Sequence, residues 1–147
     1  MPAVSATAPG KIILFGEHAV VYGQPAIAAP LTEVRSRVAI QAEIKGNPGQ
    51  VHFLAPDIDV SAEMDALQEE NSFRAGVQMV LNELGIERMP ACKVHITSTI
   101  PVASGLGSSA SVSAALIRAT AKFLGHPFDD ETVNRLAYEM EKLHHGT

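Results

Sequence analysis

A loop rich in glycine and serine, directly ahead of a helical segment, is the part of this sequence best suited to chemistry. Gly105 and Gly107 follow a strand-like run at 93–99, and Ser108 and Ser109 open the next helical segment. Glycine lets the backbone approach a ligand closely, and the first N–H groups of a helix present partial positive charge to it. The loop and helix therefore predict a cradle for phosphate groups, typical of proteins that handle nucleotides.

Two other interpretations of this loop remain open from the residues alone. Gly105-x-Gly107-x-x-Ala110 also matches the dinucleotide-binding fingerprint. Against it, residues 100–104 separate the strand from the glycines, and a second helix follows where that fold needs a strand. The other interpretation is a flexible turn followed by a helix cap, because serines are common at caps. The P-loop of NTPases is excluded, since no Gly-x-x-x-x-Gly-Lys-Ser/Thr segment occurs.

The strands that must position this loop follow from hydrophobic periodicity. Strands are predicted at 4–14, 33–44, 51–54 and 93–99, and a tight hairpin or two short strands at 19–29. The predicted inward face of 33–44 consists of Val34, Ser36, Val38, Ile40, Ala42 and Ile44. The turn at 45–49 joins 33–44 to 51–54, so these two strands are expected to pair. In 93–99, Val94 and Ile96 are expected to face inward.

Helices are predicted mostly in the second half of the chain. The first carries Phe73, Val77, Val80, Leu81 and Leu84 at helical spacing, with Asn71 or Ser72 as cap and Gly85 as stop. The second spans 108–124, where small residues allow close packing on a sheet: Ala110, Ala114, Ala115 and Ala119. Asp129 or Asp130 caps the last, whose core stripe is Val133, Leu136, Ala137, Met140 and Leu143. Strands early and helices late predict an α+β fold with helices on one face of a sheet.

The composition limits the functions open to the chain. With 147 residues, 46% of them hydrophobic, the chain is long enough for one globular domain with a core. The net charge of −5 and the 5% aromatic content argue against a nucleic-acid surface. No apolar run is long enough for a membrane span, and no secretory signal is recognisable. The single cysteine, Cys92, precludes an internal disulfide, so a cytoplasmic location is expected.

Two segments resemble motifs of one kinase superfamily. Pro101-x-x-x-Gly105-Leu106-Gly107-Ser108-Ser109-Ala110 resembles the second motif of the GHMP kinases. Residues 8–23, Ala-Pro-Gly-Lys-Ile-Ile-Leu-Phe-Gly-Glu-His-Ala-Val-Val-Tyr-Gly, resemble the N-terminal motif of the mevalonate-kinase branch. Galactokinases share Gly-Glu-His there but continue with Thr-Asp, and phosphomevalonate kinases usually lack Glu-His. The resemblance implies a fold like that of ribosomal protein S5 domain 2, with a mixed sheet and helices on one face.

The same resemblance implies ATP and Mg²⁺ as cofactors. The ATP phosphates would be held by residues of the second motif: Pro101, Gly105, Leu106, Gly107, Ser108, Ser109 and Ala110. Ser109 would also ligate Mg²⁺ through its hydroxyl, and Glu141 would be the second protein ligand. The family places this glutamate ahead of His-Gly-x-Pro-Ser-Gly-x-Asp, whose opening matches 145–147. From the residues alone, a single helical glutamate such as Glu141 is more often an exposed residue paired with Lys142 or another neighbour.

The first motif supplies the residues expected on the substrate side. By resemblance, Lys11 is catalytic, since a fixed positive charge near the acceptor hydroxyl and the γ-phosphate favours transfer. Glu17 and His18 would bind the substrate, although a structural, hydrogen-bonded His18 is an equal alternative. The implied reaction is ATP-dependent phosphorylation of a small hydroxy acid, with mevalonate favoured. Another GHMP acceptor or a non-catalytic nucleotide-binding module is the alternative.

One part of the family pattern does not occur in the sequence. The family's catalytic aspartate, in Pro-Ser-Gly-x-Asp, and its C-terminal domain are absent from these 147 residues. The sequence therefore predicts a GHMP kinase N-terminal, ATP-binding domain over 1–147, with little or no activity alone. Apolar surface left exposed predicts a homodimer or other self-association. The expected partner is a small-molecule substrate, with no nucleic acid and no membrane.

Overall fold

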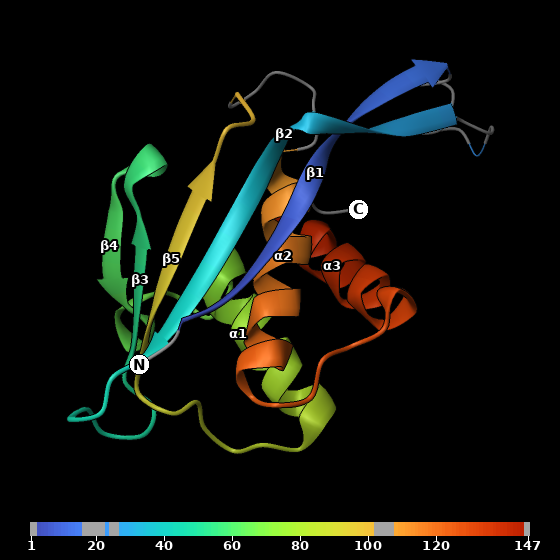
Figure 1. Cartoon of the computed structure of the whole chain (residues 1–147). Coiled ribbons are helices and arrows are strands. Elements are labelled where there is room, and N and C mark those ends of the chain that lie inside the picture. The colour runs from blue at the N-terminus through green and yellow to red at the C-terminus, as the bar shows by residue number, and fades with distance from the viewer. Residues whose placement is uncertain (1–2, 16–22, 24–26, 102–107, 146–147) are drawn as a thin grey trace.

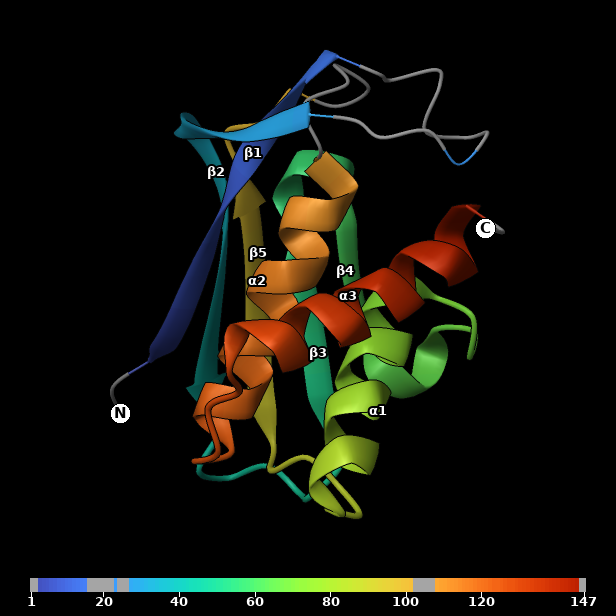
Figure 2. The ribbon, with the colours of Figure 1, turned by 90° about the vertical axis from the view of Figure 1, so that its right-hand side faces the viewer.

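A computed structural model describes residues 3–15, 23, 27–101 and 108–145. Its strands form one sheet in the order β1-β2-β5-β3-β4. Their bounds are β1 (Val4–Phe15), β2 (Ile27–Ala42), β3 (Val51–Ala55), β4 (Val60–Glu63) and β5 (Cys92–Ser98). The helices α1 (Ser72–Leu84), α2 (Ser108–Phe123) and α3 (Asp130–His145) lie on one side of this sheet (Figures 1 and 2). The predicted α+β class, a mixed sheet with helices on one face, is confirmed.

Strand β2 shows the predicted alternation. Ser36, Val38 and Ile40 are buried on the side of the helices, whereas Arg35 and Arg37 are exposed on the other. The prediction that Ile44 continues the inward face is wrong, because its side chain is 78% exposed. The strand ends at Ala42, and the chain then turns away from the core.

The predicted pairing of 51–54 with 33–44 is also wrong. Strand β3 pairs in parallel with β5, with Phe53 opposite Val94, and antiparallel with β4. Strand β2 pairs antiparallel with β1 on one edge and with β5 on the other, so neither edge is left for β3. Strand β4 was not predicted, since a four-residue edge strand gives a weak periodic signal.

Helix α1 begins and ends where its cap residues predict. The Oδ1 atom of Asn71 accepts hydrogen bonds from the N–H groups of Phe73 (2.9 Å) and Arg74 (3.3 Å). Gly85 ends the helix at φ 68°, a conformation that favours glycine. The Phe73 ring packs on Phe53 of β3 with centroids 5.7 Å apart, which fixes the start of α1 against the sheet.

Helix α2 packs directly on β1 and β2, and α3 packs on α2 and α1 (Figure 2). The small residues Ala115 and Ala119 of α2 are fully buried, as predicted. Asp129 is the cap of α3, since its Oδ1 accepts from the N–H of Thr132 at 2.8 Å. The predicted stripe of α3 is buried at Val133, Leu136 and Met140.

The prediction that Leu143 belongs to the core stripe of α3 is wrong. Its side chain is 52% exposed, and the last turns of α3 extend beyond α2 in Figure 2. Of the predicted hairpin at 19–29, only Gly23 and residues 27–29 are described. Residues 27–29 form the start of β2.

Candidate functional site

The first turn of α2 and the C-terminal part of α3 meet through two predicted metal ligands. The hydroxyl of Ser109 donates a hydrogen bond to Oε1 of Glu141 at 2.8 Å, and both residues are half-buried. Among the ion pairs of the described residues, Lys142 contacts Glu139 at 2.7 Å. Glu141 follows the buried Met140 on α3, so its side chain leaves the core stripe toward α2.

A second serine of α2 contacts the same carboxylate oxygen. The hydroxyl of Ser113 donates to Oε1 of Glu141 at 2.9 Å, and Ser113 is only 3% exposed. Sequence reasoning missed this residue, because it treated the body of α2 as a packing surface. The signal that could have found it is spacing: Ser113 follows Ser109 by one helical turn, so both face the same side of α2.

A third serine of α2 holds the helix against β1. The buried hydroxyl of Ser111 donates to the backbone oxygen of Ala8 at 2.8 Å. The pairing of β1 with β2 shifts register between Pro9 and Gly10, directly ahead of Lys11. Such irregularities re-aim the side chains that follow them and are frequent beside active sites. Lys11 is half-buried on the same strand as the Ser111 contact.

The predicted phosphate cradle is described only at its two ends. Pro101 is exposed where the described segment after β5 stops, and Ser108 and Ala110 lie with Ser109 in the first turn of α2. Between β5 and Pro101, the N–H of Ile100 donates to Oγ of Ser98 at 3.1 Å. The other predicted site residues, Gly105, Leu106, Gly107, Glu17 and His18, lie outside the described residues.

The chemistry of the donor set fits Mg²⁺. A serine hydroxyl and a carboxylate are hard oxygen ligands, and Mg²⁺ in proteins typically uses one or two side chains together with phosphate and water. Within the described ranges, no group of three or more His, Cys, Asp or Glu residues could hold a metal ion. Ser109 and Glu141 could therefore hold a cation there only together with other oxygen ligands, such as those of a nucleotide.

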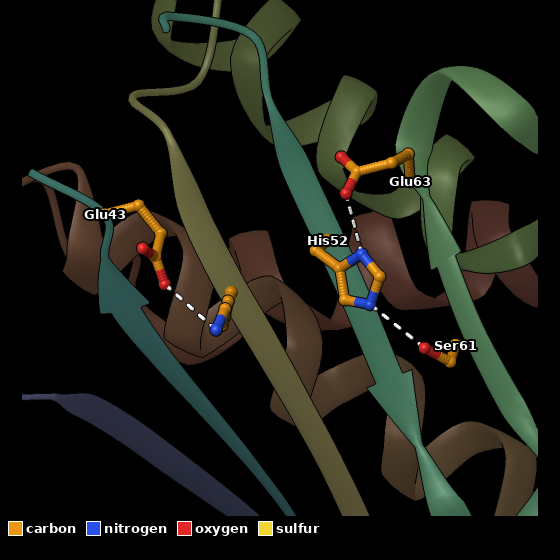
Figure 3. A network of polar contacts seen from close by, with 5 residues as sticks. Glu43, His52, Ser61 and Glu63 are labelled. Carbon is orange, nitrogen blue, oxygen red and sulfur yellow. Dashed lines mark hydrogen bonds and ion pairs between the residues drawn. The ribbon is translucent and has the colours of Figure 1, made fainter. Parts of the chain in front are cut away.

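A separate polar cluster lies on the face of the sheet away from the helices (Figure 3). The ring of His52 lies between Glu63 (2.7 Å from Nδ1) and Ser61 (3.1 Å from Nε2), and Lys93 contacts Glu43 at 3.4 Å. The side chains of Glu43, His52, Glu63 and Lys93 border an open depression of about 490 Å³. They are partnered with one another, and the cluster is distant from the contact between Ser109 and Glu141.

Cys92 lies at the edge of this depression, at the first position of β5. Burial, together with the nearby negative charge of Glu43, raises the pKa of its thiol to about 12. A thiol that stays protonated is a poor nucleophile. The surroundings of Cys92 therefore make its thiol chemically inert near neutral pH.

Comparison with known proteins identifies the class. The family model of the GHMP kinases N terminal domain matches residues 71–147, more than half of the chain, and the chain belongs to this family. The described helices include none long and apolar enough to cross a bilayer.

Individual relatives are mevalonate kinases. The chain is 39% identical to the mevalonate kinase of Thermococcus sibiricus, over 97% of this chain and 46% of that protein. The crystal structure of the Methanococcus jannaschii mevalonate kinase superposes with a TM-score of 0.85 at 28% identity, over 99% of this chain and 48% of that one. The crystal structure of the L. major mevalonate kinase in complex with R-mevalonate superposes with a TM-score of 0.69 at 32% identity, over 97% of this chain and 43% of that one. The chain spans about half the length of the relatives it matches.

Proposed function

We propose that this chain forms the nucleotide- and Mg²⁺-binding half of a kinase that transfers the γ-phosphate of ATP to the hydroxyl of mevalonate. The observation that carries the proposal is the hydrogen bond of 2.8 Å between Ser109 and Glu141. The two residues come from different helices, and they are the two side chains that the family pattern requires as Mg²⁺ ligands. Membership of the GHMP kinase family supports ATP as the donor.

Phosphoryl transfer demands positioning and charge neutralisation more than covalent help from the protein. The N–H groups at the start of α2, including those of Ser108 and Ser109, would hold phosphate oxygens at the positive end of the helix. Ser109 and Glu141 would hold Mg²⁺, which supplies neutralisation of phosphate charge when bound. Lys11, on β1 beside α2, would stabilise charge on the γ-phosphate and the acceptor oxygen.

Mevalonate is proposed as the acceptor because mevalonate kinases cover nearly the whole of this chain at 39% identity. One structural relative is described as a complex with R-mevalonate, and it is 32% identical. Glu17 and His18 are the residues proposed to contact the acceptor. Saturation-transfer NMR with mevalonate, and with galactose as the control, checks this part of the proposal. A saturation-transfer signal for galactose but none for mevalonate would contradict this part of the proposal.

The nucleotide part of the proposal is tested by calorimetric titration of the chain with MgADP. Ser109→Ala removes one proposed ligand and should weaken binding by about tenfold or more. Ser61→Ala is the matched control, because it also removes one hydroxyl hydrogen bond, on the distant face of the sheet. We expect this control to bind as the wild type does. Equal binding by both variants, or saturable NADH binding in place of MgADP, would contradict the proposal.

Turnover is a separate expectation. The acceptor hydroxyl must lose a proton, and the aspartate that accepts it in the family pattern is not among these 147 residues. We therefore propose that polypeptide 1–147 binds nucleotide but phosphorylates mevalonate slowly or not at all. A coupled ADP-release assay on the purified polypeptide measures this. Robust turnover would contradict the expectation while leaving the proposed nucleotide site intact.

A further inference from the structure

We propose that Ser113 is a positioning residue for the candidate Mg²⁺ site, holding the carboxylate of Glu141 in place while Ser109 engages the cation. This inference rests on the proposed function, because it concerns the same site. It assigns a role to a residue that lies outside both sequence motifs, one helical turn beyond the last residue of the phosphate cradle.

The geometry places one carboxylate oxygen between two hydroxyl groups. Oε1 of Glu141 accepts from Ser109 at 2.8 Å and from Ser113 at 2.9 Å. The two serines occupy successive turns of one face of α2, whereas Glu141 comes from α3. The three side chains therefore connect the two helices. Ser109 is half-buried in the first turn of α2, and Ser113 is buried behind it.

The number of lone pairs on Oε1 separates the roles of the two serines. A carboxylate oxygen offers about two sites to hydrogen-bond donors, and two hydroxyl groups already occupy them. A cation that approached Oε1 would have to replace one of these contacts. Ser109 stands at the phosphate end of the helix and is itself a proposed ligand. The bond from Ser113, in the buried second turn, is the one that can persist and keep the carboxylate oriented.

Other buried hydroxyl groups of α2 show what an ordinary helical serine or threonine does. Thr120 donates to the backbone oxygen of Leu116, one turn back in its own helix, at 2.7 Å. Ser111 donates to the backbone of Ala8. Ser113 uses neither arrangement and donates to the side chain of an ionisable residue on another helix. Mutation of a hydrogen-bond partner that orients a metal ligand typically lowers metal affinity by about 10–100-fold.

The test compares how strongly Mg²⁺ improves ADP binding in three proteins. The wild type, Ser113→Ala and Ser111→Ala are each titrated with ADP, once with excess Mg²⁺ and once with EDTA. Ser111→Ala is the matched control, because it also removes a buried serine hydroxyl from α2 but leaves Glu141 untouched. Thermal melts establish that all three proteins are folded. Alanine also suits a helix interior better than serine, which favours folding of both variants.

The factor by which Mg²⁺ improves ADP binding should be about tenfold smaller in Ser113→Ala than in the wild type. The Kd for ADP in EDTA should be the same in both proteins. Ser111→Ala should keep the wild-type improvement even if its melting temperature falls. If Ser113→Ala keeps the full improvement, or if Ser111→Ala loses as much, Ser113 is a packing residue and the inference is overturned. If the wild type gains nothing from Mg²⁺, the proposed function fails, and this inference fails with it.

Discussion

Ser109 on α2 and Glu141 on α3 meet at 2.8 Å, although 32 positions separate them in the chain. The contact exists because α3 packs across α2 with Met140, the neighbour of Glu141, buried in the core. The candidate metal site is therefore a product of helix packing and not of a single loop. Substitutions that loosen α3 from α2 should weaken the site without touching a ligand.

Lys11 should contribute more to the binding of ATP than to the binding of ADP, which lacks the γ-phosphate. If its ammonium group lies near the γ-phosphate, Lys11→Ala should weaken binding of a non-hydrolysable Mg-ATP analogue by roughly tenfold more than binding of MgADP. Lys45→Ala, in the exposed turn after β2, is the control and should change neither affinity. Equal losses for the two nucleotides would place Lys11 away from the γ-phosphate. Calorimetric titrations measure both affinities.

Asn71 should stabilise the domain through the start of α1. Asn71→Ala leaves two helical N–H groups without their acceptor and should lower the free energy of unfolding by about 1 kcal/mol. Asn82→Ala is the control, because Asn82 is exposed near the other end of α1 and its side chain contacts Gln78. Its effect should stay within about 0.5 kcal/mol. Urea denaturation measures the free energy of unfolding of both variants. Losses of similar size in the two variants would contradict the capping role of Asn71.

Cys92 should make the stability of the domain fall at alkaline pH. Its pKa is raised from 9.0 to about 12 in the folded chain. Below pH 9 the Cys92 thiol is protonated in both the folded and the unfolded chain, so its contribution to stability is fully present. Above pH 9 the unfolded chain loses this proton while the folded chain keeps it. The contribution to the free energy of unfolding should then fall by about 1.4 kcal/mol per pH unit until the folded pKa is reached.

The measurement for Cys92 is urea denaturation at pH 8 and pH 10 of the wild type and Cys92→Ala. Other groups titrate in both proteins, so the difference between them isolates the thiol. We expect the stability advantage of the wild type over Cys92→Ala to shrink at pH 10. An unchanged advantage would show that the thiol titrates normally. Slow alkylation of the folded wild type by iodoacetamide at pH 9 is expected for the same reason.

The sequence was sufficient to predict elements whose signals are local. The alternation in β2, the Asn71 cap and the buried stripe of α3 each depend on neighbouring residues, and each is present. Strand order was not predictable in this way. The turn after β2 favoured pairing with β3, but β5, which follows α1 in the chain, occupies that edge. Which strand fills an edge depends on packing between distant segments, and the short β4 carries too few residues to signal itself.

The candidate site shows the same division. Ser109 and Glu141 were predicted from motif resemblance, and the described structure brings them together. Ser113 was missed, because a serine within a run of small helical residues looks like packing until its partner on α3 is known. Exposure of Ile44 and Leu143 was missed for a related reason, since periodicity does not show where the packed neighbours end.

The central claim, that the contact between α2 and α3 holds a Mg²⁺-nucleotide, is tested most directly by one pair of variants of α3. Glu141→Gln removes the charge of the proposed ligand and keeps its shape. Glu139→Gln makes the same change two positions away, where the carboxylate contacts only Lys142 among the ion pairs described. In calorimetric titrations with MgADP, we predict a loss of about tenfold or more for Glu141→Gln and wild-type affinity for Glu139→Gln. Wild-type affinity in Glu141→Gln would contradict the account.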